Sequence, residues 1–216
     1  MRTGSIAVSL ALMAVAPSVA CGKDSQIAPG MVRFNMEIAQ RVSDVLLPGM
    51  NQPAPHGALG GTVELQVGVA RGWLLSASGN GLGSWFDYNN GLDANGKSTE
   101  FEPGFRLGID RSVLEMEGGA QALVGAGFEY VEVRSWVHNL VFTTPFDLTG
   151  PRNFIRGISF RGSLVGPSWA RMRPFARASG LLYLAEAEDP SIHSRYHWMG
   201  RSTSLALGLS VELVGP

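Results

Sequence analysis

The segment IHSRYHWMG, residues 192–200, brings two histidines and a serine close together and has the residue types of a hydrolytic site. A serine nucleophile needs a base within hydrogen-bond range and a third group that orients this base. His193 could act as the base of Ser194, and the acids of 186–189 could orient it. The spacing fixes neither the serine–histidine contact nor the histidine–acid contact. We therefore expect these residues to be ordinary polar residues of a loop, with a lipid-modifying enzyme as an alternative.

Two other groups have residue types that bind metal ions. His193 and His197 are four residues apart, but two protein ligands are too few for a zinc site. In 87–98, aspartates and asparagines recur at odd spacings as in a calcium loop, but Ser98 stands where that loop requires glutamate. Segments rich in Asn-Gly and Asp are mainly turn formers. We therefore expect no metal and no cofactor.

Many of the other charged residues occupy alternate positions of segments that switch between polar and apolar. In GTVELQVGVA, residues 61–70, Val63 and Leu65 share one face, whereas Glu64 and Gln66 share the other. A period of two indicates a β-strand with two unlike faces. The apolar face would lie inside a soluble carrier barrel and outside a membrane barrel.

Eight segments alternate in this way. They are 31–39, 62–70, 72–85, 100–110, 119–134, 155–165, 171–184 and 203–214. Short links alternate with long ones, and the long links are 40–61, 86–99, 135–154 and 185–202. An up-and-down meander would place all long loops on one rim, as in transmembrane barrels. We predict an all-β, eight-stranded antiparallel up-and-down transmembrane β-barrel with four long loops on one rim.

Two features test this strand assignment. Residues 31–47 could instead form a helix, because Pro29 suits a helix start and Pro48 would stop it. We favour the strand, since seven strands would leave an odd-numbered barrel. Pro103 and Pro174 each remove a backbone donor, so we expect both to lie near strand ends.

The composition favours charged side chains inside the barrel. Only 16% of residues are charged, and lysine occurs only at positions 23 and 97, whereas a soluble β protein usually carries many surface lysines. Arginines and carboxylates in near balance can pair in a narrow interior, with a solvated outer face as the alternative. The predicted interior charge network is Arg33, Glu37, Glu64, Glu102, Arg106, Asp110, Glu129, Arg161, Arg171, Arg173, Arg177 and Glu212.

Large aromatic residues adjoin the predicted strand ends. They are Trp73 and Trp169 beside short links, and Trp85, Tyr88, Trp136 and Trp198 beside long ones. Such rings form belts at the two membrane–water interfaces of a barrel. We therefore expect the apolar face of each strand to contact lipid.

The segments TVELQVGVA, FRLGID, SLALGLSVEL and MRPFARASGLLYL resemble strands of the small eight-stranded outer-membrane barrels of the OmpA-transmembrane, OmpX and OmpW type. The resemblance covers the mature chain in architecture. It implies a barrel embedded in the outer membrane of a Gram-negative envelope.

The N-terminal segment has the features of an export signal. Arg2 precedes a short apolar run at 6–16, and the small residues SVA at 18–20 suit cleavage. We predict a signal peptide over 1–20 and an outer-membrane β-barrel over 21–216. Cys21 follows the cleavage site, and both lipid attachment to it and plain cleavage stay open.

Two predicted loops carry apolar side chains that could cover the barrel mouth or bind a partner. This candidate surface consists of Leu46, Leu47, Leu140, Phe142 and Phe146. The net charge of −1 offers no basic surface for nucleic acid. We predict a monomeric, non-enzymatic protein among outer-membrane lipids, with a largely closed interior and loops for a structural role or surface contact. Carriers of small apolar ligands, at the loop crown or in the periplasm, are alternatives.

Overall fold

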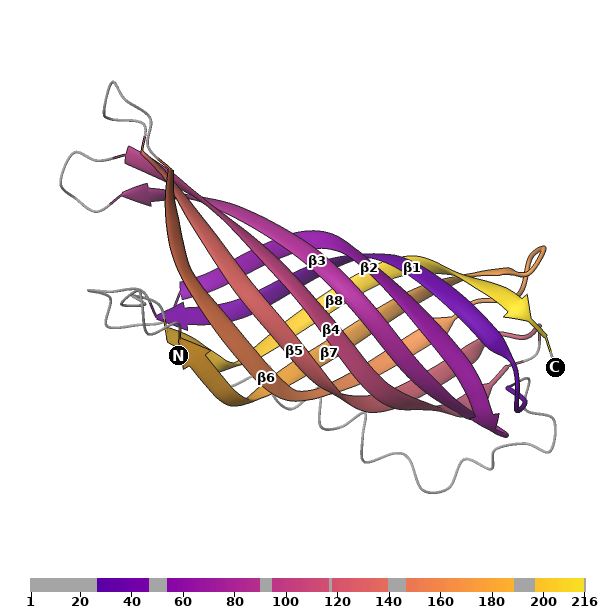
Figure 1. The fold of residues 1–216 in the computed structure, drawn as a ribbon. Coiled ribbons are helices and arrows are strands. Elements are labelled where there is room, and N and C mark those ends of the chain that lie inside the picture. Colours follow the sequence, from indigo (N-terminus) through magenta and orange to yellow (C-terminus); the bar gives the residue numbers. More distant parts are fainter. Residues whose placement is uncertain are drawn as a thin grey trace, which may run out of the picture.

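The computed structural model describes residues 27–46, 54–89, 95–116, 118–139, 147–188 and 197–215. Eight strands run along the chain: β1 (Val32–Leu46), β2 (Ala54–Ala70), β3 (Trp73–Asn89), β4 (Asn95–Glu115), β5 (Gln121–Asn139), β6 (Asp147–Val165), β7 (Met172–Glu188) and β8 (His197–Val214). Each strand pairs antiparallel with the next, and β1 pairs with β8, so the sheet closes into a barrel (Figure 1). The predicted all-β fold with eight antiparallel strands is confirmed. Among the described residues there is no helix of the length and apolarity that crossing a membrane requires.

The strand connections lie alternately at the two ends of the barrel. We call the end with the links 71–72, 116–120 and 166–171 the turn rim, and the opposite end the loop rim. Most residues of the predicted long loops are strand instead, because at the loop rim the strands leave only 47–53, 90–94, 140–146 and 189–196 between them. A membrane-spanning strand needs only about 9–11 residues. β4 has 21 residues, about twice that length, so much of it has no need to alternate between apolar and polar side chains.

Residues 32–46 form a strand, as favoured, and not a helix. β1 pairs with β2 from Val32↔Val67 to Val45↔Ala54, and with β8 from Val32↔Val214 to Leu46↔His197. β1 thus supplies the seam that closes the sheet.

The pairing register sets the width and tilt of the barrel. Following paired residues around the sheet leads from Arg33 through Gln66, Ser76, Gly108, Gly127, Ser159, Leu181 and Ser202 to Ser43. The ladder therefore returns to β1 ten residues beyond its start. Strand number and this stagger together fix a tilt in the range of about 35–45°, and Figure 1 shows the strands crossing the barrel obliquely.

One of the two strand prolines lies near a strand end, as predicted, and the other does not. Pro174 is the third residue of β7, near a strand end as predicted. Pro103 lies well inside β4, which is a correction. Pro103 pairs with Gly81 of β3, but the β4–β5 ladder skips from Phe101↔Arg134 to Gly104↔Val131. The missing donor is accommodated by this interruption, because proline has no N–H to give to β5.

The outer surface between the rims is apolar. Ile38, Leu205 and Leu207 are 68%, 68% and 71% exposed, and neighbouring outward positions on β2 and β4 carry valine, leucine, isoleucine and phenylalanine. Among the exposed arginines, Arg111 lies near the turn rim, whereas Arg156 is the central residue of β6. A contiguous apolar surface of this kind suits hydrocarbon and not water.

Apolar side chains also pack inside the barrel toward each end. Near the turn rim the cluster consists of Ile27, Met31, Leu74, Leu123, Val165 and Phe175. Toward the loop rim another cluster consists of Val131, Val133, Ile155 and Leu181. Polar side chains fill the interior between these clusters.

Candidate functional site: the charged barrel interior

Glu64 is the centre of the interior charge network. It faces inward from β2 because it alternates with the lipid-facing Val63 and Leu65, and it is only 2% exposed. The Arg161 guanidinium donates to its carboxylate from β6, on the opposite wall. Arg177 of β7 donates to Glu64 Oε1 at 3.0 Å. The acid is thus neutralised by two arginines.

The same two arginines pair with other acids. Arg161 Nε donates to Asp110 Oδ1 at 2.7 Å, and its Nη2 donates to the second oxygen of this carboxylate, which gives a bidentate pair. Arg177 Nη1 lies 2.9 Å from Glu37 Oε2. Asn35 Nδ2 adds a hydrogen bond to Glu64 at 2.8 Å. Charge-assisted bonds of this kind offset the cost of burying charge only when most donors and acceptors are matched.

A second group of ion pairs lies closer to the loop rim around Arg41. Its guanidinium donates to Glu129 of β5, across the barrel, and lies 3.5 Å from Glu102 of β4. Tyr183 donates to Ser43 at 3.4 Å in the same region. The sequence reading missed Arg41 because it placed this residue in a loop. Arg41 lies an even number of residues from Arg33 and Glu37, so alternation continued along β1 would have placed it on the inward face.

Arg106 is held by hydroxyl groups. Its Nε donates to Ser159 at 2.8 Å and its Nη1 donates to Ser76 at 3.0 Å. A Cβ on Gly127 would lie 2.9 Å from the Arg106 Cζ, and one on Gly108 would lie 2.6 Å from it. These glycines therefore leave the space that the guanidinium occupies.

Two predicted arginines lie near the turn rim. Arg33 donates to Gln121 of β5 at 3.2 Å, again across the barrel, and Arg173 donates to the Gly119 carbonyl at 2.9 Å. Glu212 is half-buried and pairs in register with Arg33.

The placement of Arg171 in the interior is wrong. Arg171 precedes β7 in a turn, has a φ of 67° and is exposed. The predicted strand began one residue too early, because β7 starts at Met172.

The aromatic residues are only partly described. Trp169 is 76% exposed on the turn rim, and the Arg111 guanidinium lies 5.2 Å from the Trp73 ring centre. Trp85, Tyr88, Trp136 and Trp198 belong to strands, but their side chains lie outside the described part. The interface belts therefore stay a prediction.

Several other predicted residues lie outside the described ranges. They are Leu47, Leu140, Phe142, Phe146, His193 and Ser194, together with the signal segment 1–20 and Cys21. Leu46 ends β1, not a loop, and its side chain is not described. Among residues whose placement is described, no three His, Cys, Asp or Glu side chains gather as metal ligands would.

Comparison with solved structures identifies the architecture. OprG from Pseudomonas aeruginosa is similar with a TM-score of 0.54 and 11% identity, covering 88% of this chain and 99% of that chain. A major outer membrane protein from Thermus thermophilus has a TM-score of 0.48 and 10% identity, covering 84% and 99%. Ail from Yersinia pestis has a TM-score of 0.47 and 10% identity, covering 86% and 99%. The likeness to OprG supports the fold, which is that of a small outer-membrane β-barrel.

No family model matches the chain, and the comparison with curated proteins finds no match.

Proposed function

We propose that this outer-membrane barrel is a non-enzymatic protein whose interior is closed to solutes and whose loop rim faces the outside. The function then depends on its surface, as a structural component or a contact site, and not on a pore. An eight-stranded barrel is just wide enough for its own side chains to fill.

Three contacts across the full width of the barrel support this proposal. Arg33 reaches Gln121, Glu64 reaches Arg161, and Arg41 reaches Glu129, each joining strands that lie four apart in the ring of eight. These contacts occur at successive levels between the two rims. Side chains therefore cross the barrel axis at three heights and obstruct the path that water or ions would take along it.

The outer surface argues against the soluble periplasmic carrier. Such a carrier would need a polar outside and an apolar lumen, whereas Ile38 and Leu207 are exposed and Glu64 and Arg161 are buried. The alternative of a loop-crown carrier depends on residues outside the described ranges.

Planar-bilayer recording tests the closed interior. The wild-type protein should give no large, stable open-channel steps. The double variant Arg41→Ala, Arg161→Ala removes two contacts across the axis and should give steps, provided that it still migrates as a folded barrel in unboiled detergent gels. Arg156→Ala, on the exposed outer surface, is the matched control and should remain silent. Large, stable steps from the wild type would overturn the proposal.

A further inference from the structure

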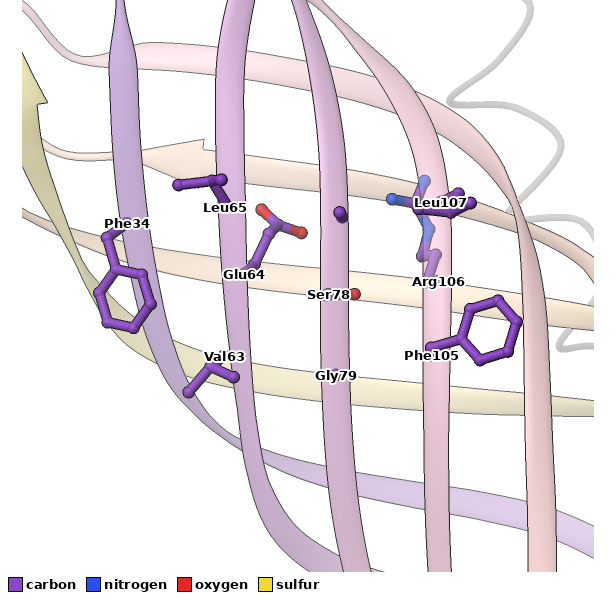
Figure 2. Close-up of a pocket in the computed structure, with 10 residues that line it drawn as sticks. Phe34, Val63, Glu64, Leu65, Ser78, Gly79, Phe105, Arg106 and Leu107 are labelled. Atoms are coloured by element: carbon purple, nitrogen blue, oxygen red, sulfur yellow. The ribbon is translucent and has the colours of Figure 1, made fainter.

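A groove runs over β3 on the lipid-facing surface, with a volume of about 360 Å³. Its floor consists of Ala77 and Gly79, which face outward from β3. Figure 2 shows larger side chains on both sides of this floor, with Leu65 on one side and Phe105 on the other. The groove exists because β3 carries small outward residues where β2 and β4 carry bulky ones.

The walls are fixed by packing. Phe105 stacks on Tyr130 of β5 with ring centres 5.4 Å apart, which holds its ring beside the groove. Toward the loop rim, the Phe101 ring leans over β3, since a Cβ on Gly81 would lie 3.2 Å from it. The groove therefore has a closed end toward the loop rim, and apolar surface continues over Leu75 toward the turn rim.

Positive charge lies at the turn-rim end of this surface. Trp73 and Arg111 are directly paired across β3 and β4, and the cation over the ring holds the guanidinium near the strand. Arg71, in the adjacent β2–β3 turn, is also exposed. Two arginines beside an aromatic ring suit a phosphate at the membrane surface.

The depth of the surface matches one lipid leaflet. From Gly79 to Trp73 is six residues of β3, or about 20 Å of strand. At a tilt of about 45° this corresponds to about 14 Å of depth, close to half of a hydrocarbon core about 30 Å thick.

We propose that this groove and its basic end hold one phospholipid with an anionic headgroup, an acyl chain lying on Ala77 and Gly79 and the phosphate at Arg111 and Arg71. The inference rests on the proposed orientation, in which the turn rim faces the inner leaflet. The lipid would fill a gap in the outer surface that ordinary annular lipids contact only transiently.

Native mass spectrometry with added phosphatidylglycerol or phosphatidylcholine tests this site. The wild type should retain one phosphatidylglycerol in preference to phosphatidylcholine. Gly79→Leu should fill the groove without backbone strain, because a Cβ there meets only the Gly104 carbonyl at 3.9 Å. It should lower the retained phosphatidylglycerol about tenfold. Gly162→Leu, on the outer face of β6 with open space around it, is the matched control and should retain the lipid.

The headgroup contact is tested separately. Arg111→Gln should remove the preference for phosphatidylglycerol, whereas Arg156→Gln, in the middle of β6 and away from this groove, should keep it. Equal retention by Gly79→Leu and the wild type, or no preference in the wild type, would overturn the lipid site. Gel mobility before and after boiling shows whether the wild type and each variant are folded barrels, so lipid lost by a variant that keeps its heat-dependent shift is not a loss of fold. Open-channel steps from a wild type that retains the lipid would overturn the closed interior and leave the lipid site standing.

Discussion

At the scale of single residues, Glu64 shows how ion pairs and hydrogen bonds can offset the free-energy cost of burying a carboxylate inside a barrel. It accepts hydrogen bonds from Arg161, Arg177 and Asn35, so its charge and its lone pairs are both matched. The arginines in turn reach Asp110 and Glu37. Each side chain therefore depends on the others.

Removing the central charge tests this dependence. Glu64→Gln should lower the free energy of unfolding by about 3 kcal/mol, because it leaves buried arginine charge uncompensated. Urea unfolding followed by the loss of the fast-migrating band in unboiled gels measures the change. Glu132→Gln is the control, since water can solvate the charge left on its partner Arg134, which is 41% exposed, and the loss should be about 0–1 kcal/mol. Equal stability of the two variants would contradict a network centred on Glu64.

The interior side chains can be predicted from alternation only where strand limits are known. Arg106, Glu129 and Arg161 follow from the period of two, and the structure gives each of them buried contacts. Arg41 and Arg171 fail because the predicted strand limits are wrong: β1 continues past Arg41 to Leu46, whereas β7 begins only after Arg171, at Met172. Which acid pairs with which arginine depends on the register of strands far apart in the sequence, so no local pattern contains it.

At the scale of elements, β1 is the strand on which closure of the barrel depends. Ala39 pairs in register with Ala206 of β8, and both side chains are buried in one cluster. A helix over these residues would not place Ala39 beside β8. The seam is therefore a direct test of the strand assignment.

A cross-link across the seam makes this test. In a Cys21→Ser background, Ala39→Cys with Ala206→Cys should form a disulfide, because directly paired strand residues have Cα atoms about 4.5–5.5 Å apart. The boiled, unreduced chain should then migrate faster than the reduced one. Ala39→Cys with Ala178→Cys is the control, since Ala178 faces outward from β7 and should not react. A helix at 31–47 would give no cross-link in either pair.

The strands were predictable in number and order, but not in length. Alternation requires two unlike environments, and these exist only where the sheet separates lipid from the interior. The part of β4 before Phe101 reads NGKSTE, which is polar on both faces and looks like a loop. These residues are strand because they pair with β3 and β5. The local sequence of β4 alone does not specify this pairing.

At the scale of the whole molecule, the defining property of the barrel is which face of its sheet meets hydrocarbon. Apolar side chains form the belt between the rims, and the exposed Arg111 lies near its turn-rim end. A belt about 25 Å tall is expected for a barrel in the outer membrane. The closed interior and the lipid groove both require this orientation.

Spin labels at each position from Thr62 to Val69, placed one at a time in β2 of the reconstituted protein, measure this orientation most directly. Oxygen dissolves in the hydrocarbon, so labels at Val63, Leu65, Val67 and Val69 should collide with it often. Labels at the intervening positions should be shielded by the barrel wall. High collision rates at Glu64 and Gln66 with low rates at Val63 and Leu65, or no alternation at all, would contradict the account.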